Sequence, residues 1–333
     1  MNSFGRLFRI NIYGESHGPE VGVVIDGCPA GLPIGVDEFL LDLARRRGGR
    51  PGTTARAEQD RPEIGSGVFS GRTTGSPILI RFRNADVRSD DYDAFRATPR
   101  PGHVDFVAEK KFGGFQDYRG AGHFSGRLTA GLVAAGVIAK KIIAPAAVKA
   151  RLLEAGGDRN VSRAVRAAQS SGDSIGGIVE CRGTTIPIGL GEPFFDSVES
   201  LVSHIVFSIP GIKAIEFGAG FRAAKTAGSR LNDAILDGSG TTRTNNAGGI
   251  NGGISNGNPI VFRVSVRPTA SISRPQWTVD LKTGKRTRLR IAGRHDCCFA
   301  IRVPVIVEAA LAVVLADLLL IEQKIPRVYS GEI

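Results

Sequence analysis

Cysteine is scarce in this sequence and is not arranged to form a recognisable site. The four cysteines among 333 residues, Cys28, Cys181, Cys297 and Cys298, include no C-x-x-C pair, and two of them are adjacent. This spacing suits neither a disulfide framework nor a zinc site. The first residues also lack the basic patch followed by an apolar stretch that marks a secretory signal. We therefore expect a reducing, cytoplasmic setting.

The chain also lacks a long apolar run that is free of charge. The longest run, residues 303–321, is interrupted by Glu308 and Asp317. A membrane span needs about 20 largely apolar residues. We therefore predict a buried helix over this segment and no association with a membrane.

Aromatic residues are few, at 7% of the chain with one tryptophan. No predicted strand carries the paired aromatic side chains on which single-stranded bases stack. The formal net charge is nevertheless +11, which is typical of proteins that bind nucleic acid or other anions. A basic nucleic-acid-binding protein is therefore one hypothesis, and the scarcity of aromatic residues weighs against it.

The usual nucleotide-binding fingerprints are absent, although glycine is abundant. The 44 glycines cluster at "RGAGHFSG" and at residues 246–257, but neither cluster forms G-x-G-x-x-G after a strand, and no G-x-x-x-x-G-K-[ST] loop is present. The sequence thus argues against a Rossmann site and against a nucleotide-hydrolysing loop. It leaves an anion or a ring ligand held by backbone N–H groups and arginines.

The arginines occur in short clusters rather than in one tail or stripe. The clusters are "RRRGGR" at 45–50, "RPGH" at 100–103, "DYRGAGHFSGR" at 117–127 and "GRHD" at 293–296. Each is interrupted by glycine or flanked by histidine, serine or aspartate. This pattern favours a folded pocket for small anions over a track along a nucleic-acid backbone.

Four of the five histidines lie among glycines or arginines. These are His17, His103, His123 and His295, whereas His204 lies on a predicted helix with apolar neighbours and is expected to be structural. The glycines around His17 predict a turn that leaves its ring exposed. Four such contexts predict one converging pocket. No H-x-H, H-E-x-x-H or carboxylate-rich cluster accompanies them, so no metal site is predicted.

Hydrophobic periodicity predicts strands and helices in irregular alternation, which favours an α+β layered domain over a doubly wound sheet. The predicted strands cover 8–14, 21–27, two segments within 68–84, 174–183, 212–218 and 259–268, and the predicted helices cover 36–47, 124–143, 196–207 and 303–323.

A series of long motifs runs along the chain. They are "GRLFRINIYGESHGPEVGVVIDGCPAGLPI", "RRRGGRPGT", "RPGHVDFVAEKKFG", "DYRGAGHFSGRLTAGLVAAGVIAKKI", "GDSIGG", "GLGEPFFDS", "NNAGGINGGISNGNPI", "VRPTASI" and "GRHDCCFAIRVPVIVEAALAVVLAD". In order and rough spacing these motifs resemble the chorismate synthase family over residues 5 to about 320. The resemblance implies one catalytic domain over 1–333, a β-α-β sandwich with antiparallel sheets in the middle and helices outside.

The resemblance also implies an activity. A lyase of this family converts 5-enolpyruvylshikimate 3-phosphate into chorismate and phosphate by an anti-1,4-elimination, the last step of the shikimate pathway in aromatic amino acid biosynthesis. Reduced FMN takes part without net redox change, and the family's enzymes are cytoplasmic homotetramers. Whether this chain reduces its own flavin with NADPH is left open.

Motif matching assigns the catalytic groups. His103 resembles the acid toward the phosphate, His17 the acid that protonates the flavin, and Asp296 the aspartate beside the flavin N5. Ser16 and Ser125 resemble helpers in the same hydrogen-bond relay.

Ligand-binding residues follow from the same resemblance. The implied anion clamps are Arg46, Arg50, Arg100, Arg127 and Arg294. The implied flavin contacts are His123, Phe124, Ser125, Pro210, Gly211, Asn246, Gly252, Arg267, Pro268, Thr269, Ala270, Ser271 and Arg294. His123, Asn246 and Cys297 depart from the arginine, histidine and proline of many members. A flavin-independent phosphoester hydrolase is the other alternative, because it too would use arginines with histidines.

Overall fold

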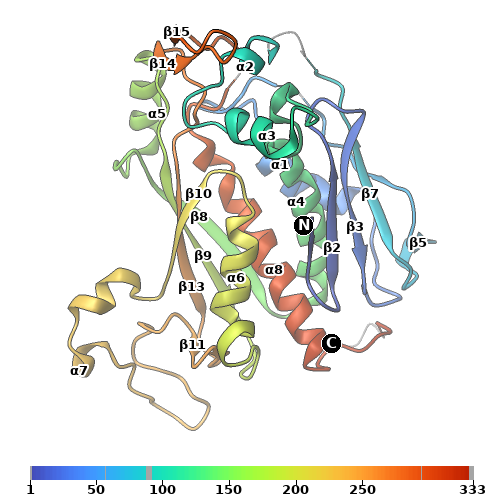
Figure 1. Ribbon diagram of the computed structural model, residues 1–333. Helices are drawn as coiled ribbons and strands as arrows, with labels where there is room; N and C mark the ends of the chain where they lie inside the picture. Colours follow the sequence, from blue (N-terminus) through green and yellow to red (C-terminus); the bar gives the residue numbers. More distant parts are fainter. Residues whose placement is uncertain (1, 57, 88–91, 294, 330–333) are drawn as a thin grey trace.

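Two antiparallel sheets enclose a layer of helices in the computed structural model, which describes residues 2–56, 58–87, 92–293 and 295–329 (Figure 1). The first sheet has the order β1 (Ser3–Phe4), β2 (Arg9–Gly14), β3 (Glu20–Asp26), β7 (Ile78–Arg83) and β4 (Glu63–Ile64). The second has the order β10 (Ile212–Phe217), β13 (Ile260–Val266), β9 (Gly177–Thr184) and β8 (Ala147–Ala155). The predicted α+β class with antiparallel sheets is confirmed.

The middle layer is built from the three helices α1 (Asp37–Arg46), α4 (Thr129–Ile142) and α8 (Val303–Ile321). α4 packs against β3 and β7, and α8 packs against β8 and β9. A Cβ on Gly136 of α4 would lie 2.3 Å from the Cβ of Ala309 of α8, so glycine permits the close approach of the two helices.

The predicted layer order, with sheets inside and helices outside, is therefore wrong. α4 and α8 are apolar on nearly every face, and their side chains from Thr129 to Ala139 and from Val305 to Leu319 are buried. A helix that is apolar all round needs packing partners on every side, which only the middle position provides. Each sheet contributes one face to this core.

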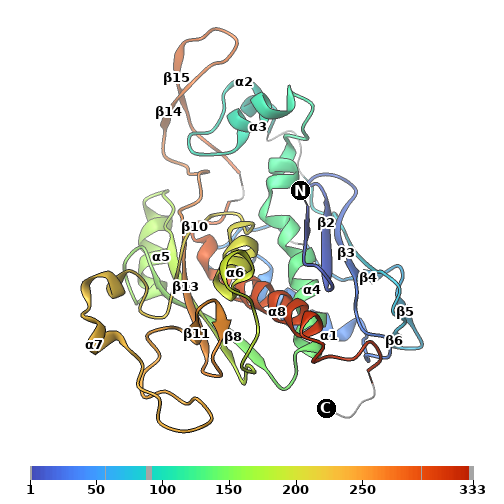
Figure 2. The same cartoon turned by 60° about the horizontal axis from the view of Figure 1, so that its bottom comes forward.

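Smaller elements surround these layers. The helices are α2 (Ala94–Ala97), α3 (Asp105–Phe112), α5 (Val161–Ser170), α6 (Val198–Phe207) and α7 (Gly228–Leu231). The 3-10 turns are η2 (Arg119–Phe124), η3 (Gly126–Leu128), η4 (Phe194–Asp196), η5 (Gly220–Lys225) and η6 (Phe299–Ile301). The hairpins are β5–β6 (Val68–Phe69, Arg72–Thr73), β11–β12 (Ile250–Asn251, Ile254–Ser255) and β14–β15 (Gln276–Val279, Arg286–Leu289). Figure 2 shows the β14–β15 hairpin extending away from the layers.

The two acidic residues of α8 are buried with partners. Glu308 receives hydrogen bonds from Arg45 and Lys140, at 2.6 Å and 2.9 Å. Asp317 accepts hydrogen bonds from the backbone N–H groups of residues 6, 7 and 8, at 2.7 to 3.1 Å. By length and composition α8 could cross a membrane, but most of it is buried inside this structure. The prediction of a buried helix is confirmed.

Replacing Asp317 tests how α8 holds the start of the first sheet. Asp317→Asn should lower the free energy of unfolding by about 2–3 kcal/mol, because three backbone N–H groups, that of Phe8 fully buried, lose a charged acceptor. Urea unfolding measures this change. As a control, Asp196→Asn removes only the solvent-exposed pair with Arg6 and should cost less than about 1 kcal/mol. Equal stability of Asp317→Asn and the parent protein would contradict this account of the N-terminal attachment.

Candidate functional site

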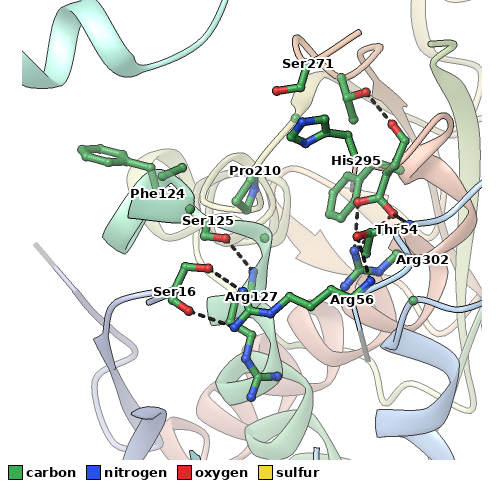
Figure 3. Close-up of a pocket in the computed structure, with 18 of the residues that line it drawn as sticks. Ser16, Thr54, Arg56, Phe124, Ser125, Arg127, Pro210, Ser271, His295 and Arg302 are labelled. Atoms are coloured by element: carbon green, nitrogen blue, oxygen red, sulfur yellow. Dashed lines mark hydrogen bonds and ion pairs between the residues drawn. The ribbon is translucent and has the colours of Figure 1, made fainter. Parts of the chain in front are cut away.

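A cavity of about 630 Å³ opens where the ends of α1, α4 and α8 meet (Figure 3). Its walls come from segments that are far apart in the sequence. They include residues 46–49, 54–56 and 58–60, Tyr92, 102–104, 120–121, 124–127, 210–211, 267–271, 295–296, Phe299 and Arg302. The volume falls within the range of about 300–1,000 Å³ that is usual for small-molecule sites. Of the four histidines predicted to converge in one pocket, His103 and His295 line this cavity, whereas His17 and His123 do not.

A buried carboxylate between two arginines forms the floor of the site. Asp60 makes ion pairs with Arg46 and Arg127, and all three side chains are buried. Burial alone would raise the pKa of Asp60, but the two guanidinium charges hold it below its usual range. One carboxylate faces two cations here, so the cluster carries a net positive charge.

Arg46 keeps a buried donor without a partner. Its Nε is buried and has no hydrogen-bond acceptor within the described chain. Unpaired buried donors are costly and therefore rare. Since Arg46 lines the cavity, an anionic ligand bound there could supply the missing acceptor.

Arg56 fixes the loop that carries Ser16. Its Nη1 donates to the Ser16 hydroxyl at 2.8 Å and its Nη2 donates to the Ser16 carbonyl oxygen at 2.9 Å (Figure 3). Glu58 in turn receives a 2.7 Å hydrogen bond from Arg56. The sequence did not predict a role for Arg56, although it lies three residues after the end of the "RRRGGRPGT" motif.

His103 lies in the cavity wall against two opposite charges. Its Nδ1 is 2.6 Å from Oδ1 of Asp105 and 3.0 Å from Nη2 of Arg100. Burial lowers the pKa of His103, the positive charges of Arg100 and Arg267 lower it further, and Asp105 opposes them without cancelling the shift. His103 is therefore more readily deprotonated than an ordinary histidine.

Asp296 is held by three different segments. Its carboxylate accepts hydrogen bonds from Arg302 at 2.9 Å and 3.3 Å and from the backbone N–H of Thr54 at 2.9 Å, and its carbonyl oxygen accepts one from the Thr269 hydroxyl at 2.6 Å (Figure 3). Sequence reasoning did not identify Arg302, which directly precedes α8. His295 also lines the cavity, and burial lowers its pKa.

His17 does not have the exposed ring that its flanking glycines predict. It is buried, and its ring packs edge to face against Tyr92 at 5.0 Å between centroids. A Cβ on Gly120 would come within 2.6 Å of the His17 imidazole, so that glycine and the tyrosine enclose the ring. The prediction of exposure is wrong because a loop from the distant 117–127 motif covers the turn.

The predicted catalytic and ligand-binding residues divide into those that line the cavity and those that do not. Those that line the cavity are Ser16, Ser125, Phe124, Pro210, Gly211, Arg267, Pro268, Thr269, Ala270, Ser271, Arg46, Arg100, Arg127, His103 and Asp296. Arg294 lies outside the described residues.

Five other predicted residues lie elsewhere. His17 is not among the residues that line the cavity. His123 contacts the Gly14 carbonyl oxygen and the Asn2 side chain, at 2.8 Å and 3.1 Å. Arg50 donates to the Arg45 carbonyl oxygen at 2.5 Å.

Asn246 and Gly252 belong to the glycine-rich region beside β11. The Asn246 side chain donates to the Leu231 carbonyl oxygen at 3.0 Å. Gly252 lies in the turn between β11 and β12 with a φ of +62°, and no atom would crowd a Cβ there. Their roles stay predictions.

The side chains offer no evident metal centre. Within the described ranges no group of three or more His, Cys, Asp and Glu side chains is arranged to hold an ion. The four cysteines are free. The site is instead rich in guanidinium groups, which suit phosphate and carboxylate ligands.

Comparison with known proteins gives one consistent result. The family model of chorismate synthase matches residues 8–320. A curated chorismate synthase of Chitinophaga pinensis is 59% identical over 332 residues, covering 99% of this chain and 100% of that protein. One from Dehalococcoides mccartyi is 46% identical over 98% of this chain and 99% of its own length. A solved structure described as a crystal structure of chorismate synthase matches with a TM-score of 0.72 at 26% identity, covering 96% of this chain and 93% of that one.

Replacing Asp60 tests the charge arrangement of the floor. Asp60→Asn should lower the free energy of unfolding by about 3–5 kcal/mol at pH 7, because two buried guanidinium groups lose their counter-charge. Asn tolerates the positive φ of 51° at this position, so the substitution isolates the charge. Chemical denaturation at several pH values measures the effect.

The pH dependence of that difference has a defined sign. The folded-state pKa of Asp60 is lowered, so its stabilisation is present above the ordinary carboxyl pKa and is lost as the pH falls through the folded value. The gap between the parent protein and Asp60→Asn should therefore narrow at low pH. Glu63→Gln, which weakens solvent-accessible pairs with Arg81 and Arg83, is the control and should change the free energy of unfolding far less than Asp60→Asn does at pH 7, across the same pH range. A gap that is constant from pH 7 to pH 3 would refute the charge explanation.

Proposed function

The chain belongs to the chorismate synthase family, and we propose that it converts 5-enolpyruvylshikimate 3-phosphate into chorismate and phosphate with reduced FMN bound in the cavity. Membership makes it a lyase of the last step of the shikimate pathway. The observation that carries the detailed proposal is the unpaired Nε of buried Arg46 in a cavity that also presents His103 and Asp296. A phosphorylated substrate would satisfy that donor beside a candidate acid.

The residues of the cavity fit a flavin. Phe124 is 41% exposed and lines one side of the cavity, while the Pro210–Gly211 backbone and residues 267–271 line other parts of its wall (Figure 3). An exposed aromatic ring and a wall of small residues suit a planar ring system, and Arg267 suits its phosphate. Reduced FMN, when bound, would lend the electron density that helps phosphate leave and would take up the hydrogen from C6.

The arginines bind and orient the substrate. The C3–O bond to phosphate breaks and the C6–H bond breaks, so negative charge grows on the departing phosphate and the ring gains a second double bond. Arg46, Arg100 and Arg127 line the cavity and place positive charge where that negative charge develops. This lowers the barrier without any net electron transfer.

His103 donates a proton to the departing phosphate. Its Nδ1 is engaged by Asp105 and Arg100, which leaves Nε2 for the transfer. The surroundings of His103 lower its pKa. The negative charge of a bound phosphate would raise this pKa, so substrate binding would favour the protonated form of His103.

Asp296, Ser16, His17 and Ser125 act on the flavin side of the site. The Asp296 carboxylate is fixed by Thr54 and Arg302, and its main-chain carbonyl oxygen accepts a hydrogen bond from Thr269 of the 267–271 segment. The family's acid role for His17 stays a proposal, and its burial means that a proton would travel through neighbouring groups such as Ser16. Arg50, Arg294, His123, Asn246 and Gly252 remain proposed contacts of the bound ligands.

We extend the proposal to the assembly and its setting. Residues 1–333 would act as one catalytic unit, because the hydrophobic core runs from Phe8 to Leu319 without a break between the two sheets. Large apolar side chains at Phe194, Phe195 and Phe221 are exposed, which supports burial in a homotetramer. The expected setting is the cytoplasm, where thiols stay reduced.

An anaerobic assay tests the proposed reaction. Purified protein is mixed with 5-enolpyruvylshikimate 3-phosphate, with or without dithionite-reduced FMN, and chorismate absorbance and phosphate release are followed together. Equal amounts of chorismate and phosphate, formed only with reduced FMN, are expected. Phosphate without chorismate would instead identify a flavin-independent hydrolase. NADPH in place of dithionite shows whether the chain reduces its own flavin.

Replacing His103 tests the acid role. His103→Ala should slow turnover by about 100-fold or more while FMN binding stays near that of the parent protein. In the parent protein, the alkaline limb of kcat/KM should lie at lower pH than that of kcat, because the bound phosphate raises the pKa of His103. Unchanged turnover in the variant, or coincident limbs, would remove His103 from this role.

A further inference from the structure

Arg302 contacts two separate segments of the cavity wall through one side chain. It lies directly before α8, and 8% of its side chain is exposed. Its Nη1 donates to the Asp296 carboxylate at 2.9 Å and 3.3 Å, and its Nε donates to the backbone carbonyl oxygen of Arg46 at 2.7 Å. The same guanidinium therefore contacts the proposed flavin-side aspartate and the residue that holds the anion-binding donor.

The other contacts of Asp296 leave its carboxylate incompletely held. Thr54 supplies one backbone N–H to one carboxylate oxygen, and Thr269 binds the main-chain carbonyl oxygen instead of the side chain. A single hydrogen bond allows rotation about the Cβ–Cγ bond. Arg302 supplies the second fixed point and the opposite charge.

A guanidinium suits this task better than an ammonium group. It is planar and presents several N–H donors in a fixed geometry, so one side chain can bond a carboxylate and a carbonyl oxygen in different directions. Burial lowers the pKa of Arg302, while the neighbouring Asp296 charge opposes the shift. The cost of burying this charge must be offset by the contacts that it makes.

We propose that Arg302 is a positioning residue that fixes the Asp296 carboxylate relative to the Arg46 anion site, and so aligns the flavin side of the reaction with the departing phosphate. The inference rests on the proposed function. Arg302 would act through its contacts with Asp296 and Arg46. Misplacing a reacting group by about 1 Å can cost about 100-fold in rate, so the alignment is expected to matter more for kcat than for KM.

The chain offers a matched control at the same pair of helices. Arg45, one residue before Arg46 on α1, makes an ion pair with Glu308 of α8 at 2.6 Å. Arg45 and Glu308 do not line the cavity. Arg45→Gln therefore removes an ion pair between α1 and α8, and Arg302→Gln removes contacts of the residue that precedes α8. Of the two variants, only Arg302→Gln changes the proposed site.

The experiment compares Arg302→Gln, Arg302→Lys and Arg45→Gln with the parent protein in the anaerobic assay. Melting temperatures report folding, and substrate deuterated at C6 reports the C–H step. We expect kcat to fall about 30-fold or more in both Arg302 variants, KM to stay within about threefold, and the C6 isotope effect on kcat to rise. Arg45→Gln should keep kcat and the isotope effect, whatever its melting temperature.

Other outcomes distinguish a failure of the proposed function from a failure of the proposed role of Arg302. A parent protein that makes no chorismate with reduced FMN would remove the proposed function. With an active parent, kcat of Arg302→Lys within twofold of it would overturn the inference, as would a raised KM with an unchanged isotope effect. If Arg302→Gln does not fold, Arg302→Lys decides alone, because lysine keeps the charge but cannot reproduce the two-directional contact.

Discussion

The site depends on one buried carboxylate, Asp60, shared by the guanidinium groups of Arg46 and Arg127. Two buried guanidinium groups that contact the same carboxylate lie close together, and they would repel each other strongly in a medium of low dielectric constant. The negative charge of Asp60 offsets this repulsion between Arg46 and Arg127, but it neutralises only one of their two positive charges. The remaining charge, together with the unpaired Nε of Arg46, makes the cavity selective for an anion. The proposed use of a phosphorylated substrate follows from this imbalance.

The layered fold brings the charged groups together. α1 ends at Arg46, α4 follows directly after the segment that carries Arg127, and α8 begins just after Arg302. Since these helices form one buried layer, their ends meet at one edge of the sandwich (Figure 1). Loops connected to both sheets line the cavity there. The apolar faces of the helices therefore determine where the cations lie, although those faces take no part in binding.

Much of this arrangement could be predicted from the sequence, and the errors have physical causes. The long motifs identified the family, and alternation in segments such as 259–268 identified β13. β8 was missed because "AVKARLLEA" consists mainly of good helix formers, and its strand state comes from pairing with β9. Periodicity also could not order the layers, since it shows which face is apolar and not what covers it. Arg56 was missed because its partner Ser16 is 40 residues away, and Arg302 was missed because one of its partners, Arg46, is 256 residues away. The exposure of His17 was misjudged because its cover comes from residues more than 70 positions away.

The most direct test of the central claim is a crystal structure of the protein with 5-enolpyruvylshikimate 3-phosphate and FMN bound. The account predicts a phosphate oxygen within hydrogen-bonding distance, about 3 Å, of Nε of Arg46, with His103 on the same side and the flavin ring between Phe124 and Asp296. A substrate phosphate bound away from the Asp60 cluster, with the Arg46 donor still unpaired, would contradict it.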